Sequence, residues 1–311
     1  MRGLIVTADD FGAAVEVNEA VEIAHRQGIL TSASLMVAAP ASADAVRRAR
    51  VMPSLRVGLH VVLVEGKPIL PAGEVSLLVD ESGAFRSDMT SLGCLIACSA
   101  RARRQLAAEI TAQFEAFHAT GLALDHCNAH KHFHVHPVVA GLLLTVGERF
   151  GLKAIRIPLE NRPLLSNIEP ESRSSIPSLI APFAVLLRRR VRAAGLYTAD
   201  RVFGLEWTGQ MTKRRLLELV RALPSGVSEI YLHPATGPYP GNAPGYRYSD
   251  ELAALIDPDV VAACRNSFIK RGGFADFMPR AEPFPPVGAG ILPTAARLVR
   301  RFMRSRDRKA E

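Results

Sequence analysis

The stretch Gly3-Leu-Ile-Val-Thr7, followed directly by Ala8-Asp9-Asp10-Phe11-Gly12, decides the fold class. The first five residues form a short apolar run with β-branched side chains, which predicts a buried strand, and the acidic residues after them predict a loop. Apolar residues at helical spacing follow between Val15 and Ala24, and Gly28 ends them. A strand that gives way to a helix in this manner is the first half of a βαβ unit.

The same order recurs along the chain. Short apolar runs predict further strands and amphipathic stretches predict helices between them, so we expect an α/β fold with a parallel sheet. The C-terminal ends of such strands gather on one face of the sheet, where functional residues collect. Two stretches break the alternation, residues 65–99 and 160–196. The expected strands are Ser32–Val37, Leu55–His60, Lys153–Ile157 and Ser228–Leu232, and the expected helices are Ser42–Arg50, Arg101–Thr120, Val138–Phe150, Thr212–Leu223 and Asp250–Ile256.

Length and composition limit the class of protein. With 311 residues, of which 48% are hydrophobic and 22% charged, the chain has the size of one large α/β domain or two small ones and can bury a sizeable core. Its four cysteines form no zinc-ribbon spacing, and the N-terminus lacks a signal-peptide core. We therefore expect a cytoplasmic protein without a disulfide scaffold.

The formal net charge of +8 is concentrated at the C-terminus. Residues 297–311 contain seven basic and two acidic residues, which argues against a basic nucleic-acid-binding face on the main domain. We expect a catalytic domain over residues 1–290 and a basic tail over residues 291–311. The tail either touches anionic lipid or is solvated.

A second basic segment follows the apolar run Ile180–Leu187. Pro182 interrupts this run, and four arginines come directly after it, at positions 188, 189, 190 and 192. The run is too short to span a bilayer, but together with the basic tail it could lie at an anionic cytoplasmic membrane surface. The alternative is a core helix with a solvated basic end.

Asp9 and Asp10 are adjacent carboxylates at the expected end of the first strand. At a transition from strand to loop, both side chains can turn toward one pocket. One carboxylate can then bind a cation while the other accepts a proton. The alternative is that one of them caps the following helix.

Histidines mark the other expected strand ends. His60 ends the third strand, and His233 ends the strand over Ser228–Leu232. Five of the nine histidines fall between His126 and His136, and His130, His132, His134 and His136 alternate, so an extended segment would direct all four to one side. Imidazole is a good ligand for zinc and similar divalent ions, so this cluster predicts a metal or catalytic site.

These motifs together resemble the YdjC-like carbohydrate deacetylases, which are similar to chitooligosaccharide deacetylase. The resemblance rests on residues 7–12, Gly58-Leu59-His60, residues 130–134 and His233-Pro234, and it extends from residue 1 to about residue 280. It implies a (β/α) barrel-like, TIM-barrel-related fold with the active site at the strand C-termini. Residues 34–40, 61–68 and 128–132 resemble most the hopanoid-biosynthesis-associated (HpnK) branch, which is taken to deacetylate an N-acetylglucosaminyl hopanoid.

The resemblance also implies roles for individual residues. Asp10, His60 and His130 match the metal ligands, Asp9 matches the general base, and His233 matches the histidine that assists the leaving amine. One divalent ion is implied: zinc, manganese and cobalt suit this ligand set, whereas family descriptions often name magnesium. Where many relatives have an acidic residue, this chain has Asn128. We expect His132, His134 and Tyr239 to contact the sugar.

The implied activity is removal of an acetyl group from an N-acetylglucosamine-type sugar, either on a hopanoid glycolipid or on soluble chitooligosaccharides. Two other classes stay open. A metal-dependent glycosidase or phosphodiesterase would need further carboxylates, which the strand ends hardly provide. A non-catalytic metal-binding or lipid-carrier protein would use the histidines only to hold metal. The natural acceptor, the metal and the oligomeric state are left open.

Overall fold

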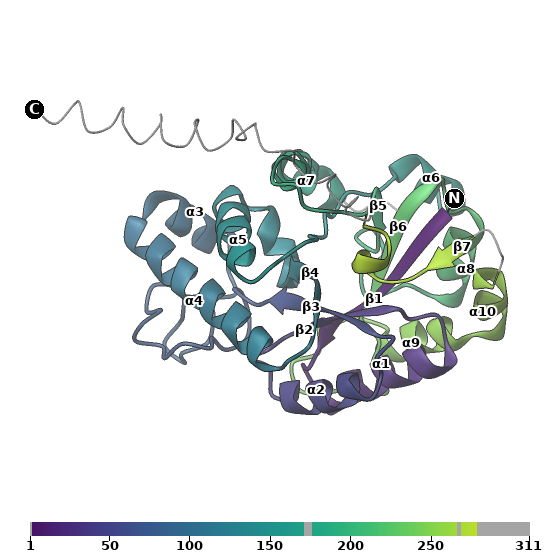
Figure 1. Cartoon of the computed structure of the whole chain (residues 1–311), viewed down its shortest axis with the longest axis horizontal. Helices are drawn as coiled ribbons and strands as arrows, with labels where there is room; N and C mark the ends of the chain where they lie inside the picture. Colours follow the sequence, from purple (N-terminus) through teal and green to yellow (C-terminus); the bar gives the residue numbers. More distant parts are fainter. Residues whose placement is uncertain (1, 171–175, 266–268, 279–311) are drawn as a thin grey trace, which may run out of the picture. The chain divides into compact units, whose positions relative to one another are not determined.

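The computed structural model describes residues 2–170, 176–265 and 269–278, and it shows a parallel sheet surrounded by helices (Figure 1). The strands pair in the order β4-β3-β2-β1-β6-β5, and β7 pairs with β1 off this path. Every pairing between these strands is parallel, which confirms the predicted α/β class. The strands are β1 (Arg2–Phe11), β2 (Ser32–Leu35), β3 (Arg56–Val61), β4 (Leu124–Ala129), β5 (Arg201–Phe203), β6 (Gly226–Leu232) and β7 (Ile269–Arg271).

The sheet curls into a partial barrel. Strands β4 and β5 stand at the two ends of the strand order. The predicted strand Lys153–Ile157 forms no regular ladder, and two isolated parallel bridges replace it, Cys127 with Ile155 and Ala154 with Tyr197. The segment between β4 and β5 is therefore only loosely joined to the sheet by backbone hydrogen bonds.

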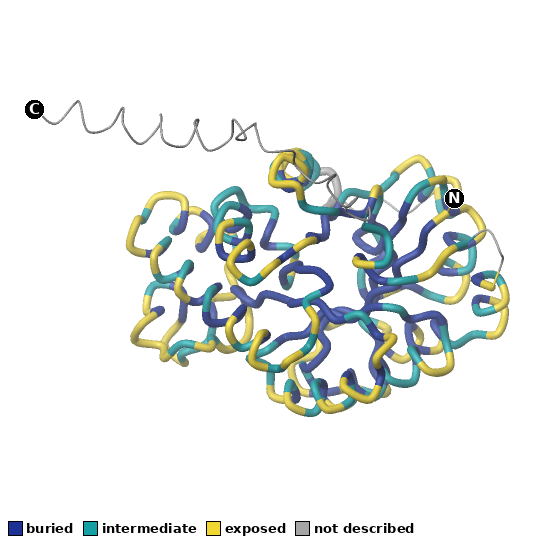
Figure 2. The backbone as a smooth tube through the Cα atoms, in the orientation of Figure 1, coloured by how far each residue is buried: buried dark blue, intermediate teal, exposed yellow. Residues whose placement is uncertain are grey.

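Most of the predicted helices are present within one or two residues of their expected bounds. The helices have a buried side and an exposed side, as the alternation of buried and exposed tube in Figure 2 shows. The helices are α1 (Val15–Gln27), α2 (Ser42–Arg50), α3 (Met89–Cys98), α4 (Ala100–Ala119), α5 (Pro137–Arg149), α6 (Arg162–Ile168), α7 (Ile176–Ala193), α8 (Lys213–Arg221), α9 (Tyr248–Ile256) and α10 (Pro258–Cys264), with 3-10 turns η1 (His130–Val135) and η2 (Phe274–Asp276).

Several local expectations were wrong. The region 65–99 leaves the sheet as expected but contains helix α3, and the region 160–196 contains α6 and α7. The histidine cluster was expected to be extended, yet it folds into η1, where Lys131 and His132 have positive φ angles of 52° and 55°. The alternation of imidazoles therefore does not place them on one side. The expected basic tail over residues 291–311 lies outside the described residues.

Strand β1 is the centre of the fold, because it pairs with β2 and β6 along its length. Its residues from Gly3 to Phe11 are all buried, which is why the sequence there is so apolar. The strand continues through Asp9 and Asp10, so these residues do not lie in a loop as expected. The helix-capping alternative is also wrong, because α1 is preceded by Ala14 and receives no side-chain cap.

Gly58 in β3 allows a histidine to pack directly against the sheet. A Cβ atom at this position would lie 2.4 Å from Cε1 of His126. His126 is completely buried and its ring stacks on Phe274 at 4.6 Å, so it has little room to move. The glycine is therefore required by a close approach within the core.

We expect Gly58→Ala to lower the free energy of unfolding by about 1–3 kcal/mol, the usual effect of overpacking a core. Gly73→Ala is the matched control, because no atom lies within 4 Å of a Cβ there. Urea unfolding of both variants measures the difference. A Gly58→Ala protein as stable as the control would contradict the close packing of His126.

Candidate active site

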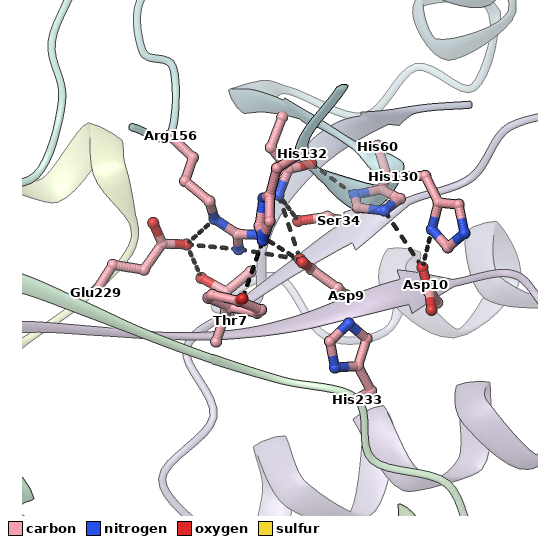
Figure 3. Close-up of polar contacts among 12 residues, drawn as sticks. Thr7, Asp9, Asp10, Ser34, His60, His130, His132, Arg156, Glu229 and His233 are labelled. Atoms are coloured by element: carbon pink, nitrogen blue, oxygen red, sulfur yellow. Dashed lines mark hydrogen bonds and ion pairs between the residues drawn. The ribbon is translucent and has the colours of Figure 1, made fainter. Parts of the chain in front are cut away.

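Three predicted residues meet at the C-terminal ends of strands β1, β3 and β4. Asp10 comes from β1, His60 from β3, and His130 is the first residue after β4 (Figure 3). Their ligand atoms all lie within 4.8 Å of one another. Oδ1 of Asp10 is 3.3 Å from Nε2 of His60 and 3.2 Å from Nδ1 of His130. The sequence motifs thus place three metal-ligating side chains around one point.

The backbone of β1 explains how two adjacent aspartates serve one pocket. Side chains of successive strand residues normally point to opposite faces. Here the register between β1 and β2 shifts between Ala8 and Phe11, and Asp10 has a φ of 61°. A non-glycine residue in this left-handed region is strained, and such strain gathers at functional sites. The distortion turns Asp10 toward the two histidines. Asp9 instead points toward Arg156 and Asn128.

Asn128 fixes the orientation of His60. Its Nδ2 donates to Asp9 Oδ1 at 3.2 Å and to Ser34 Oγ at 3.0 Å, so its Oδ1 is the acceptor that lies 2.7 Å from His60 Nδ1. Nδ1 of His60 therefore carries the proton. Nε2 is then the ring nitrogen of His60 that faces the Asp10 carboxylate, where it is free to bind a proton or a cation. An amide at position 128 fills this role without adding a negative charge beside Asp9.

The three side chains fit a divalent cation. A lone pair of His60 and a carboxylate oxygen that face each other at 3.3 Å repel unless a cation or a proton lies between them. Burial would raise the pKa of Asp10, but His130 and His60 lower it well below its usual value. Two imidazoles and one ionised carboxylate are ligands for zinc, manganese or cobalt, and they leave positions open for water and substrate.

Asp9 belongs to a separate buried cluster beside the triad. Its carboxylate accepts two hydrogen bonds from the Arg156 guanidinium, to Oδ2 and, at 3.0 Å, to Oδ1. Burial alone would raise the pKa of Asp9, but Arg156, with smaller effects from His60 and His233, lowers it well below the usual range. Asp9 is therefore ionised, desolvated and held in one orientation.

Arg156 was missed by the sequence analysis. Its guanidinium is completely buried, donates to Glu229 Oε1 at 2.9 and 2.7 Å, and lies 4.6 Å from the ring centroid of Tyr231. Thr7 Oγ1 also donates to this oxygen of Glu229, at 2.8 Å. One signal was present in the sequence, because Arg156 is a single charged residue inside the apolar run 154–157.

The remaining histidines of the cluster separate in space. Nε2 of His132 lies 2.9 Å from the Tyr231 hydroxyl, and the ring is partly exposed. His134 is completely buried, with its Nε2 3.0 Å from the carbonyl oxygen of Arg156. His136 caps α5 by accepting from the amide of Val138. Only His132 of these three lies at the site, and contact of His132 or His134 with a sugar stays a prediction.

His233 lies at the end of β6, close to both aspartates (Figure 3). Its backbone amide donates to the buried carboxylate of Glu251, and its Nδ1 is buried without a partner in the described residues. The ring packs against Tyr246 at 5.2 Å and Tyr231 at 5.8 Å. The imidazole is thus held by aromatic rings rather than by hydrogen bonds.

Tyr239 lies in the loop after β6 that was expected to contact substrate. It is mostly buried, and its ring packs on Tyr248 at 5.3 Å. Burial raises the pKa of Tyr239, and the nearby Asp10 carboxylate raises it further, so the hydroxyl is neutral. The loop therefore places packed tyrosine rings next to the triad. Contact of Tyr239 with a substrate stays a prediction.

Fold and site together define a class of α/β enzymes in which a triad that fits a divalent cation and a buried carboxylate share the C-terminal end of a parallel sheet. Residues 3–266 match the family described as YdjC-like protein, and the chain belongs to this family. The family predicted from the sequence motifs is thereby confirmed.

Relatives with assigned functions extend this result. A carbohydrate deacetylase from Geobacillus stearothermophilus is 32% identical over 265 residues, which cover 84% of this chain and 92% of that protein. A carbohydrate deacetylase from Mus musculus is 33% identical over 261 residues, covering 78% and 79%. A crystal structure from Enterococcus faecalis V583, of a protein named for cellobiose-phosphate cleavage, matches with a TM-score of 0.70 and 25% identity over 89% of this chain and 99% of that one.

We expect His130→Ala to lose tightly bound metal, because two ligands from the protein bind a divalent ion far more weakly than three. Metal analysis of the purified, metal-loaded protein measures the content. His118→Ala is the control, since His118 is an exposed residue at the end of α4. Stoichiometric metal retained by His130→Ala at the same site would show that the triad is wrongly assigned.

Proposed function

We propose that this protein is a metal-dependent N-deacetylase that removes the acetyl group from an N-acetylglucosamine-type sugar. The observation that carries the proposal is the pairing of two adjacent sites: a three-ligand triad, and a separate carboxylate, Asp9, fixed by Arg156. Carbohydrate deacetylase is also the name of the relatives that match most of this chain. Family and geometry therefore support the same hydrolysis of a carbon–nitrogen bond.

Asp10, His60 and His130 would hold the ion. When bound there, a divalent ion polarises the acetyl carbonyl and lowers the pKa of water, which an unreactive amide requires. Asp9, ionised and unable to rotate away from Arg156, accepts a proton from the attacking water. His233 donates a proton to the amine nitrogen as the C–N bond breaks, and acetate and a free amino sugar are released.

The position of His233 supports its role as the acid. The ring is close to both aspartates, and Nδ1 has no partner within the described residues. Because Nδ1 is buried, the closeness of the ring to Asp9 and Asp10 is the observation that supports the role. Tyr246 and Tyr231 hold the ring on two sides, so that its orientation is fixed without using up a ring nitrogen.

The glycosidase alternative is poorly supported by the same geometry. Glycoside hydrolysis needs two carboxyl groups placed across the scissile bond, one of them protonated. Asp9 is fixed in an ion pair with Arg156, and Asp10 faces two histidines, so neither carboxyl is available as an acid. A protein that only stores metal would have no need of the buried Asp9–Arg156 pair.

The proposal also concerns the natural acceptor, the molecule that carries the acetylated sugar. The residues that resemble the hopanoid-associated branch support an N-acetylglucosaminyl hopanoid, and soluble chitooligosaccharides are the alternative. A glycolipid substrate would agree with the expected location in the cytoplasm, at the inner surface of the membrane. None of the described helices is long and apolar enough to cross a bilayer.

Asp9→Asn separates binding from chemistry. The variant should keep its metal, because Asp9 is not among the three ligands, and should lose about 10²- to 10⁴-fold in rate, the usual contribution of a general base. Asp259→Asn, at an exposed carboxylate on α10, is the control. Acetate release and metal content are measured on the same samples. Near-normal turnover by Asp9→Asn would remove it from the mechanism.

The acceptor is tested by incubating metal-loaded protein with an N-acetylglucosaminyl lipid and, separately, with diacetylchitobiose. We expect acetate from at least one of them and faster release from the lipid. Faster release from chitobiose would favour the soluble substrate. No acetate from either, by a protein with full metal content, would favour the metal-binding or carrier alternative.

A further inference from the structure

The outer face of α7 carries exposed apolar side chains in its first half and the exposed Arg189 in its second, while Arg188 and Arg192 lie farther round the helix and line a cleft. Phe183 is 46% exposed and Leu186 is 39% exposed, and Pro182 beside them is exposed as well. The arginines at positions 188, 189, 190 and 192 follow within the same helix, and α7 contains no acidic residue. The other exposed large hydrophobic side chains of the described chain, Val15, Val51 and Ile69, lie on separate elements.

The inner face of α7 packs against the core of the protein. Ala184, Leu187 and Val191 are buried, and Ile180 packs on the cluster that contains Tyr231. Nη1 of Arg190 donates to the carbonyl oxygen of Pro137 at 2.8 Å, which ties α7 to the start of α5. The helix also contacts η1, the turn that begins with the ligand His130. Phe183 and Leu186 are therefore not needed for packing, and they lie on a helix that is attached to the active site.

The basic half of α7 is not neutralised by nearby acids. Arg188 and Arg192 line a cleft of about 750 Å³ together with Arg162 and Arg201. The cleft contains two carboxylates, but Glu160 accepts from the amides of residues 204–206 and Asp200 accepts from the amide of Val227. Within the described ranges, no ion pair is formed by Arg188, Arg189 or Arg192. These guanidinium groups therefore present positive charge to any anionic surface.

We propose that the outer face of α7 binds the surface of an anionic lipid bilayer. A helix at a membrane interface buries apolar side chains at the level of the headgroups and directs basic ones to the lipid phosphates. Phe183 and Leu186 would enter the headgroup region, and Arg189 would bind the lipid phosphates, with Arg192 at the edge of the contact. Guanidinium groups suit phosphate because they donate paired hydrogen bonds. The bilayer would lie next to the helix that contacts η1.

This binding does not depend on the deacetylase activity, but the two together would select membrane-borne sugars as substrates. Vesicle binding requires neither substrate nor metal, so its failure and a failure of the proposed reaction are distinguishable. Acetate release from a soluble sugar should be unchanged in the α7 variants. The basic residues after position 290 are kept in every protein tested, so that differences report on α7 alone.

The experiment is co-sedimentation of the full chain with phosphatidylcholine vesicles that contain or lack phosphatidylglycerol. We expect binding only with the anionic lipid, and weaker binding at high salt. Arg189→Gln should bind about fivefold more weakly, since a basic residue near the surface contributes about fivefold, or about 1 kcal/mol. Phe183→Ser/Leu186→Ser should lose at least tenfold. Arg101→Gln and Val51→Ser, at exposed positions on other elements, are matched controls and should bind as the unmodified chain does.

A second measurement covers the case in which a double variant fails to fold. In Phe183→Trp the new indole should shift its fluorescence to the blue when anionic vesicles are added, while the buried Trp207 contributes a constant signal. Equal binding by the α7 variants and the controls would overturn the proposal, as would binding to neutral vesicles alone or an unshifted indole. Loss of a dimer by Phe183→Ser/Leu186→Ser, without any effect on vesicle binding, would assign the face to a second copy of the chain instead.

Discussion

The buried ion cluster of Asp9, Arg156 and Glu229 is the interaction on which the site depends. A buried guanidinium is tolerable only when it is paired and its donors are used. Arg156 donates two hydrogen bonds to Asp9 and two to Glu229. Its guanidinium also lies over the ring of Tyr231. The cluster links β1, β6 and the segment that joins β4 to β5. The cluster therefore connects the segment between β4 and β5, which forms only isolated bridges with the sheet, to the central strand β1 next to the site.

A second buried network reaches the same site from the opposite end of the sheet. Asp125 accepts from the amides of Phe274 and Ala275 and lies 3.0 Å from His126 Nδ1. Nε2 of His126 is 3.0 Å from Ser34 Oγ, which in turn accepts from Asn128. Asn128 then contacts both Asp9 and His60. Each polar side chain in this network orients the next, so a distant packing contact such as that at Gly58 bears on the orientation of His60, a proposed metal ligand.

The sequence predicted those parts of the site that depend on local pattern. Asp10, His60, His130 and His233 follow apolar strand patterns, and parallel strands bring their C-terminal ends together whatever the loops between them. Arg156 could not be placed in this way, because its partner Asp9 is 147 positions away and the segment around it forms only isolated bridges. The turn η1 could not be predicted either, because alternating histidines are compatible with a strand and with a tight turn. The positive φ angles of Lys131 and His132, which make the turn, leave no mark in the sequence.

The adjacency of Asp9 and Asp10 on one strand has an evolutionary consequence. The spacing between Asp9, the proposed proton acceptor, and Asp10, a proposed metal ligand, is set by a single backbone distortion in a strand that is buried from Gly3 to Phe11, so it cannot be adjusted without disturbing the core. The loop that follows β6, which would meet the rest of a substrate, and helix α7, which would meet a membrane, lie outside the sheet. Changes in those outer parts can therefore alter which acceptor is bound without disturbing the strand that carries both aspartates.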